Sequence, residues 1–175
     1  MAQGDSQAGT GVDRFDEWAQ VYDLYYPAGS RKDLEFRLSR KLILAARRWT
    51  NLIDETIRLG TGQRRAGWQT LFALAFAARP LTTLELSERV GVQWPALVRT
   101  LNGLEAEGLV RRSENPDDGR SRLIDITDAG QKLVADVQEV LDPTRGAVLA
   151  GMTDDEVLIA TRLLDKVLNG ATDPR

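Results

Sequence analysis

Two short amphipathic segments separated by a glycine most constrain what this 175-residue chain can fold into. Residues 82–85 (Thr-Thr-Leu-Glu) form a capping box and Gly91 follows the last apolar residue, so the pattern predicts a helix of about eight residues. Pro95 then suits the first turn of a second helix that ends at Gly108. The buried stripe of that helix is Leu97, Leu101 and Leu104, with Val98 beside it. Two short helices joined by a glycine-containing turn indicate a helix-turn-helix.

A β-hairpin is predicted directly after the second helix. Residues 109–113 have strand composition, residues 115–119 (Asn-Pro-Asp-Asp-Gly) form a turn, and residues 120–126 return as a strand. Such a hairpin is a wing, whose guanidinium groups can lie on phosphates or enter the narrow minor groove of a duplex. The turn aspartates can orient the adjacent arginines by ion pairing. The alternative is a solvated hairpin in which arginine and aspartate merely neutralise one another.

The chain before this segment is predicted to be helical. Aromatic residues recur at helical spacing behind Asp13, which predicts a short aromatic helix that packs its apolar face on the body: Phe15, Trp18, Tyr22 and Tyr25. Residues 31–59 predict a helix about 45 Å long, with Gly60 as its stop. A helix of that length has more apolar face than one small domain can cover, which favours a second subunit. Residues 65–78 predict the next helix.

Two more helices are expected after the hairpin. Thr127 can cap a helix over residues 128–150, in which Pro143 should cause a kink or a local break. A second capping box at residues 153–156 opens a last helix, and Gly170 is expected to end it.

The chain contains neither cysteine nor histidine. Disulfides, thiolate nucleophiles, Ser-His-Asp catalysis and Cys- or His-based metal sites are therefore excluded. No pair of acidic residues stands out, so we expect no enzyme, no cofactor and no metal. No apolar run reaches the roughly 20 residues of a membrane span, and the N-terminus does not resemble a signal peptide, which makes a cytoplasmic protein the default expectation.

The net charge of −3 does not by itself predict a nucleic-acid partner. The charge is uneven along the chain, with net values of −4 for residues 1–30, +4 for 31–60, +3 for 61–80, −2 for 81–127 and −4 for 128–175. A prediction of DNA binding must therefore rest on the positions of the arginines and not on the net charge.

These elements predict a mainly α fold with a small β-hairpin wing, in which a winged helix-turn-helix is flanked by N- and C-terminal dimerisation helices. The expected parts are an N-terminal arm with the short aromatic helix (1–30), dimerisation helices (31–64 and 128–175) and the winged helix-turn-helix DNA-binding domain (65–127).

Residues 34–168 resemble the MarR (multiple antibiotic resistance regulator) family, and its SlyA-like members most. The motifs are Pro95-x-Leu97-Val98-Arg99-x-Leu101, Leu104-Glu105-x-x-Gly108-Leu109-Val110, and Asp117-Asp118-x-Arg120 leading to Thr127-x-x-Gly130. The resemblance implies a homodimeric DNA-binding transcription regulator, in most cases a repressor, whose terminal helices interleave. The family commonly has arginine where this chain has Gly119, and often serine or threonine where it has Gln93. These departures concern individual DNA contacts and not the fold.

The expected DNA-contacting residues lie opposite the leucine stripe or in the wing. They are Gln93, Trp94, Ala96, Arg99, Thr100, Arg111, Arg112, Arg120 and Arg122. Arg99 can make a bidentate contact to guanine, although a salt bridge inside the dimer or a pocket-facing role is the alternative. We place Arg120 at the minor groove with Arg122 nearby, and Arg111 and Arg112 as phosphate or structural candidates.

An effector site is expected beside the long helix, if the helices pack as the resemblance implies. Its candidate residues are Arg40, Arg47, Arg48, Trp68 and Phe72, with Trp49 as further apolar surface. Aromatic walls with guanidinium groups suit a small aromatic carboxylate. Alternatively the tryptophans are core and the arginines cover the surface. The core role is favoured for Trp49, and both roles stay open for Trp68.

Two functions therefore compete. The first is a ligand-responsive repressor that binds a pseudo-palindromic operator as a homodimer and is released by an aromatic carboxylate-type effector. The second is a winged-helix protein-interaction module without sequence-specific DNA binding, in which the wing arginines meet an acidic protein.

Overall fold

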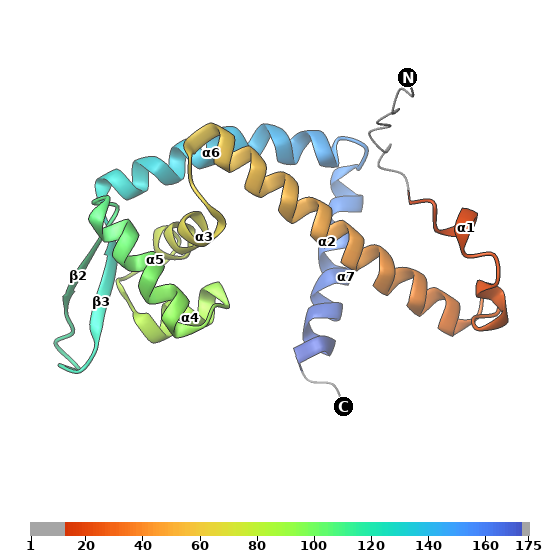
Figure 1. Ribbon diagram of the computed structural model, residues 1–175, viewed down its shortest axis with the longest axis horizontal. Helices are drawn as coiled ribbons and strands as arrows, with labels where there is room; N and C mark the ends of the chain where they lie inside the picture. The colour runs from red at the N-terminus through yellow and green to blue at the C-terminus, as the bar shows by residue number, and fades with distance from the viewer. Residues whose placement is uncertain (1–12, 173–175) are drawn as a thin grey trace, which may run out of the picture. The chain divides into compact units, whose positions relative to one another are not determined.

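A computed structural model describes residues 13–172 of the chain. Its elements in chain order are α1 (Phe15–Trp18), the 3-10 helix η1 (Tyr22–Leu24), α2 (Arg31–Thr61), α3 (Arg65–Ala75), β1 (Leu81–Thr82), α4 (Thr83–Val90), α5 (Trp94–Ala106), β2 (Val110–Glu114), β3 (Arg122–Ile126), α6 (Asp128–Leu149) and α7 (Asp154–Thr172) (Figure 1). Two compact units are present, and the boundary between them falls inside α2, after Trp49. The architecture is mainly helical with one small antiparallel sheet, as the sequence predicts. The first residues of the expected arm and the last three of the chain lie outside the described part.

The aromatic segment of the first unit is not one helix, so that expectation was wrong. It consists of the single turn α1 and the separate η1, because the backbone leaves the helical conformation at Ala19 and Val21. Phe15 is buried, but Trp18 is 65% exposed and Tyr25 is 74% exposed. The break turns Tyr22 back toward Phe15, and their ring centroids lie 5.0 Å apart.

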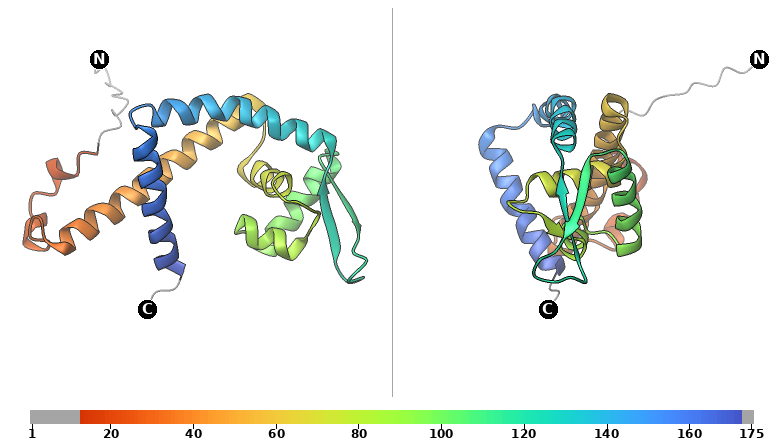
Figure 2. Two further views of the ribbon diagram at one scale, coloured as in Figure 1. Left: turned by 180° about the vertical axis from the view of Figure 1, so that it is seen from behind. Right: turned by 90° about the vertical axis from the view of Figure 1, so that its left-hand side faces the viewer.

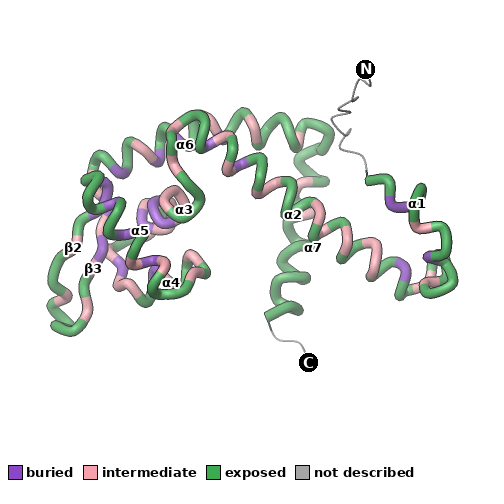
Figure 3. The backbone as a smooth tube through the Cα atoms, in the orientation of Figure 1, coloured by how far each residue is buried: buried purple, intermediate pink, exposed green. Residues whose placement is uncertain are grey.

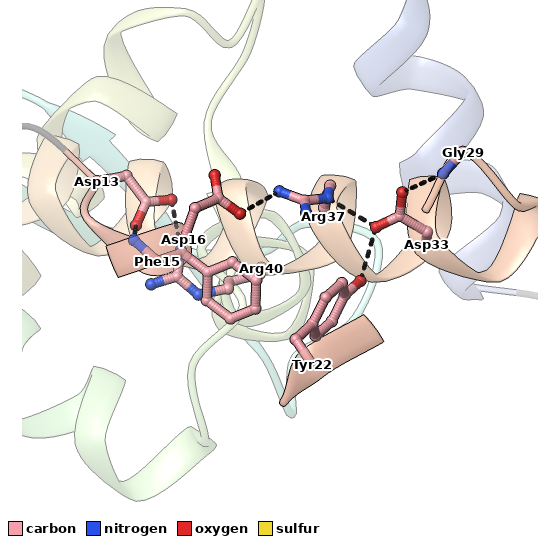
Figure 4. Close-up of polar contacts among 8 residues, drawn as sticks. All are labelled: Asp13, Phe15, Asp16, Tyr22, Gly29, Asp33, Arg37 and Arg40. Carbon is pink, nitrogen blue, oxygen red and sulfur yellow. Dashed lines mark hydrogen bonds and ion pairs between the residues drawn. The ribbon is translucent and has the colours of Figure 1, made fainter. Parts of the chain in front are cut away.

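A buried carboxylate ties η1 to the start of α2 (Figure 4). Asp33 accepts hydrogen bonds from the Tyr22 hydroxyl (2.9 Å), the Gly29 amide (2.9 Å) and Nε of Arg37 (2.6 Å). The Gly29 amide and the Arg37 guanidinium hold the pKa of Asp33 below its usual value. Burial, followed by the bond to Asp33, raises the pKa of Tyr22 to about 12. Because both oxygens of the buried carboxylate accept hydrogen bonds, this network fixes the arm on α2.

Helix α2 does not stop at Gly60 as expected. It runs on to Thr61, and Gly62 follows with a positive φ of 74°. A β-carbon at position 60 would lie 2.7 Å from Cγ1 of Val140 in α6. Gly60 is therefore required for the close approach of two helices, whereas Gly62 is the residue whose left-handed backbone ends the helix.

The second unit has its core between α3, α4, α5, the sheet and the start of α6. Leu97, Leu101 and Leu104 of α5 are buried in it, as predicted. Helix α3 ends at Ala75, one turn earlier than expected, and its C-terminal backbone closes as Ala77 donates to the Leu74 carbonyl. In Figure 3 the buried positions of this unit gather on the inner faces of these elements.

The sheet has one strand more than the sequence predicts. Its order is β1-β3-β2, with Leu81 opposite Ile124 and Val110 opposite Ile126. The hairpin of β2 and β3 extends away from α6 with α5 beside it (Figure 1, Figure 2). The returning strand begins at Arg122 and not at residue 120, because the turn extends through Ser121, whose amide donates to the Asp118 carbonyl.

The capping box of α4 is present as predicted. The Glu85 amide donates to Oγ1 of Thr82 (3.2 Å), and the Thr82 amide donates to the Glu85 carboxylate (2.8 Å). The Arg79 guanidinium and both donors of Thr82 lower the pKa of Glu85 to about 2. Gly91 ends the helix with φ 70°.

The last two helices run on past residues that were expected to interrupt or end them. Helix α6 has no break at Pro143, whereas the alternative of a kink there stays a prediction, and α7 continues past Gly170 to Thr172. The second capping box is confirmed, since Thr153 and Glu156 exchange hydrogen bonds. No side chain of α7 is buried, so its apolar residues stay unpartnered in the single chain (Figure 3). Each helix within residues 13–172 is too short or too polar to cross a membrane.

Candidate nucleic-acid interface

Helix α5 presents a polar face opposite its leucines. Gln93 caps it with an extended backbone, Trp94 is its first residue, and Pro95 fills a position whose amide has no helical partner. Gln93, Trp94 and Arg99 are exposed. The other two predicted contact residues of this helix, Ala96 and Thr100, are half-buried, and the Thr100 hydroxyl donates to the Ala96 carbonyl (3.2 Å).

Two arginines of the wing are paired across the hairpin. Arg111 lies opposite Asp125 in the strand register, and its Nη2 is 2.5 Å from Oδ2 of that aspartate. Arg122 lies opposite Glu114 at 3.3 Å. Arginines and acidic residues of the hairpin therefore neutralise one another in part, which was the alternative named for the wing. The acids that take part are strand residues and not the turn aspartates.

Arg112 links the hairpin to the helix. Its guanidinium pairs with Glu105 and donates to Oδ1 of Asn102 (2.8 Å), both of which belong to α5. Only 25% of the Arg112 side chain is exposed. This contact holds the spacing between α5 and β2.

The turn of the wing is organised by hydrogen bonds of its own side chains. Asp118 accepts from the Arg120 amide (3.0 Å), and Asn115 donates to the Ser121 hydroxyl (2.8 Å). Asp118 thus orients the backbone of Arg120 and not its guanidinium. Across residues 13–172, the guanidinium groups of Arg99 and Arg120 have neither an ion-pair partner nor a hydrogen-bond partner within the chain.

A groove of about 570 Å³ lies between α5, the start of α4 and the wing. One wall is apolar and is formed by Leu84, Trp94, Val98 and Leu101. The other wall contains the guanidinium-bearing residues Arg112, Arg120 and Arg122. Arg112 is paired with Glu105 and Arg122 with Glu114, and Asp118 lines the groove as well. Arg120 is therefore the lining arginine that, among the described residues, is left to meet a polyanion in this groove. The described residues include no group of acidic side chains that could hold a metal ion.

The residues expected at an effector site fall in two different units. In the first unit, Arg40 pairs with Asp13 and lies over the Phe15 ring at 4.5 Å, while Arg47 and Arg48 are exposed. Trp49, the last residue of the first unit, is half-buried. In the second unit, Trp68 and Phe72 form an edge-to-face pair. The site itself stays a prediction.

Sequence reasoning missed the acidic partners of the wing and the apolar residue Leu84. The partners Asp125 and Glu114 follow from strand register, which a hairpin with a known turn would have indicated. Leu84 is 59% exposed in the first turn of α4, and nothing in its local pattern marks it as a groove residue.

The helix-turn-helix of α4 and α5, followed by the β2-β3 hairpin, defines a winged-helix protein of the kind that binds DNA. The family model described as MarR family matches residues 64–121. The transcriptional regulator PA3341 is 32% identical over 77% of this chain and 98% of its own, with a TM-score of 0.68. A MarR variant from E. coli, solved with operator DNA, is 25% identical over 80% of this chain and 99% of its own, with a TM-score of 0.67.

The PcaV transcriptional regulator from Streptomyces coelicolor, solved with its natural ligand, shares the fold at 22% identity, 73% and 92% coverage and a TM-score of 0.62. Taken with the family match, these similarities show that the chain belongs to the MarR family. It is a DNA-binding transcription regulator, as the resemblance implies. The SlyA-like subtype stays a prediction.

Proposed function

We propose that the chain represses transcription by binding a pseudo-palindromic operator as a homodimer. The observation that carries this proposal is a pair of guanidinium groups, Arg99 on α5 and Arg120 in the wing, that have no partner among residues 13–172, with the groove extending to the wing. In this proposal Arg99 contacts a guanine edge in the major groove, and Arg120 enters the adjacent minor groove. A protein bound there excludes other proteins from the same DNA.

The dimer is supported by apolar surface that the single chain leaves uncovered. Leu38, Leu52 and Leu59 of α2 are exposed at seven-residue multiples, and Leu164 and Leu168 of α7 are exposed as well. Apolar residues repeated every seven positions suit packing against another helix. A two-fold axis through such an interface would place the wings on half-sites about one helical turn apart. We therefore keep residues 31–64 and 128–175 as the proposed dimerisation segments around the proposed DNA-binding domain, 65–127.

The test compares unpartnered and paired arginines. Operator DNA is first selected from random duplexes with the full chain, and affinities are measured at several salt concentrations. Arg99→Ala should cost about 1–3 kcal/mol and relax preference at one base position. Arg120→Ala should weaken specific and random DNA alike, A·T-rich flanks most, because a minor-groove arginine responds to groove width.

Arg111→Ala is the matched control, since it removes a wing arginine that Asp125 already neutralises. It should change affinity less than either of the other two variants. If all three variants bind as the unmodified chain does, the proposed docking is wrong. If no DNA is selected and binding does not weaken with salt, the protein-interaction module becomes the better account.

We further propose that a small aromatic carboxylate releases the operator. This is supported by Trp68, whose indole N–H is buried without a hydrogen-bond partner among the described residues. An unpaired buried donor costs about 1–3 kcal/mol, which a ligand acceptor would recover. The edge-to-face Phe72 ring supplies an apolar wall beside it, with centroids 5.8 Å apart. PcaV shows that this fold can hold a ligand in one protein.

Benzoate and phenylacetate are suitable probes for this site. A ligand at Trp68 should raise the unfolding temperature at millimolar concentration and release selected DNA. Trp68→Phe keeps an aromatic ring and removes only the donor, so it should lose most of that response. No stabilisation by any aromatic carboxylate, or an equal response in Trp68→Phe, would remove the assignment.

A further inference from the structure

The first residue of α5 is a tryptophan that the described part of the chain leaves about half exposed. Trp94 is 51% exposed, and its indole makes no ring contact with another aromatic residue in the described part of the chain. Leu84 of α4, 59% exposed, lines the same groove. Arg112, Arg120 and Arg122 of the wing line the same groove. Uncovered apolar surface of this kind on a binding face indicates a contact with the partner.

The groove has a defined place in the proposed complex. If α5 lies in the major groove and the wing lies over the adjacent minor groove, the sugar-phosphate strand that separates the two grooves must pass between them. The space available for it is the groove of about 570 Å³. Trp94 stands on the α5 side of that space, at the helix N-terminus, where recognition helices contact base edges.

We propose that Trp94 recognises a thymine in each half-site through its C5-methyl group. This inference rests on the proposed operator binding and adds a specificity to it. Among the base edges in the major groove, the thymine methyl is the apolar group, and apolar side chains contact it. Cytosine has a hydrogen atom at C5 in place of the methyl group, so it offers the indole less apolar surface.

A competing contact gives a different pattern. An indole packed on deoxyribose, or donating its N–H to a phosphate, would add affinity for every sequence alike. A methyl contact instead raises affinity only for DNA that has thymine at one position. Replacing thymine by deoxyuridine removes only the methyl and keeps base pairing, so the two cases can be separated.

The experiment uses the full chain and DNA selected by it from random duplexes. Each thymine of a half-site is replaced in turn by deoxyuridine, and affinity is measured for the unmodified chain, Trp94→Ala and Trp94→Phe. Thermal unfolding of each variant confirms that it folds. At one thymine position, we expect the replacement to lower the affinity of the unmodified chain about fourfold when it is made in one half-site, and on the order of fifteenfold when it is made in both. These factors correspond to the burial of one methyl group per half-site.

Trp94→Ala should bind thymine and deoxyuridine operators equally, while Trp94→Phe should keep the preference because it retains an apolar face. The inference is overturned if deoxyuridine changes the affinity of Trp94→Ala as much as that of the unmodified chain, if no thymine responds, or if Trp94→Phe behaves like Trp94→Ala. Failure to select any DNA would overturn the proposed operator binding itself, and the inference with it. The two failures are therefore distinguishable.

Discussion

Gly130, at the start of α6, holds the base of the wing against the rest of the second unit. A β-carbon there would lie 2.2 Å from the Leu109 carbonyl oxygen and 2.7 Å from Cγ1 of Ile126. That carbonyl already accepts the Thr127 amide at 3.1 Å, so it cannot move away without weakening a hydrogen bond. Gly130→Ala should therefore displace the backbone on which both strands of the hairpin depend.

The magnitude follows from three contributions. Overpacking costs about 1–3 kcal/mol. The weakened hydrogen bond costs about 1 kcal/mol. Alanine in place of glycine inside a helix stabilises the fold by about 1 kcal/mol through its helix propensity. The net destabilisation is about 1–3 kcal/mol, and since the hairpin moves, DNA affinity should fall as well.

Gly103→Ala in α5 is the matched control, because a β-carbon there meets nothing within 4 Å. It should stabilise the fold by about 1 kcal/mol through helix propensity alone. Urea unfolding of both variants at one fixed protein concentration measures the difference, which should be about 2–4 kcal/mol. Equal stability of the two variants would refute the reasoning about close approach at Gly130.

Three further outcomes are expected. The pKa of Glu85 is lowered from 4.5 to about 2, so its contribution to the free energy of unfolding is present above pH 4.5 and is lost as pH falls toward 2. Glu85→Gln should flatten this loss in acid unfolding curves, and an unchanged curve would contradict the reasoning. The pKa of Tyr22 is raised from 10 to about 12, so its contribution to the free energy of unfolding is present below pH 10 and is lost as pH rises toward 12. Tyr22→Phe should remove this loss of stability at alkaline pH in the same measurement, and a persisting loss would count against the Asp33 network. Leu52→Asp on the exposed face of α2 should shift sedimentation from dimer to monomer at micromolar protein, whereas a monomeric unmodified chain would defeat the dimer proposal.

The parts of the fold that the sequence predicts well are those decided by neighbouring residues. The capping box at Thr82 and Glu85 satisfies its own donors within four residues, so its geometry does not depend on distant packing. The three buried leucines of α5 follow from helical period in the same way. The sequence therefore predicts the winged helix-turn-helix from local patterns alone.

The parts that it misses depend on contacts between distant residues. Strand β1 has two residues and exists only because β3 pairs with it, so no local alternation marks it. Gly60 has the same local context as a helix stop, and only Val140 explains its role. Arg111 is ion-paired and Arg120 is not, and this difference likewise depends on strand register and turn geometry.

The account depends most on α5 in the major groove with the wing in the adjacent minor groove, and footprinting of the full chain on selected DNA tests this most directly. Dimethyl sulfate reports guanine N7 in the major groove, and hydroxyl radicals report the minor groove. We expect protected guanines in two half-sites about one helical turn apart, flanked by minor-groove protection that Arg120→Ala removes. Protection that is absent, independent of sequence, or unchanged in Arg120→Ala would contradict it.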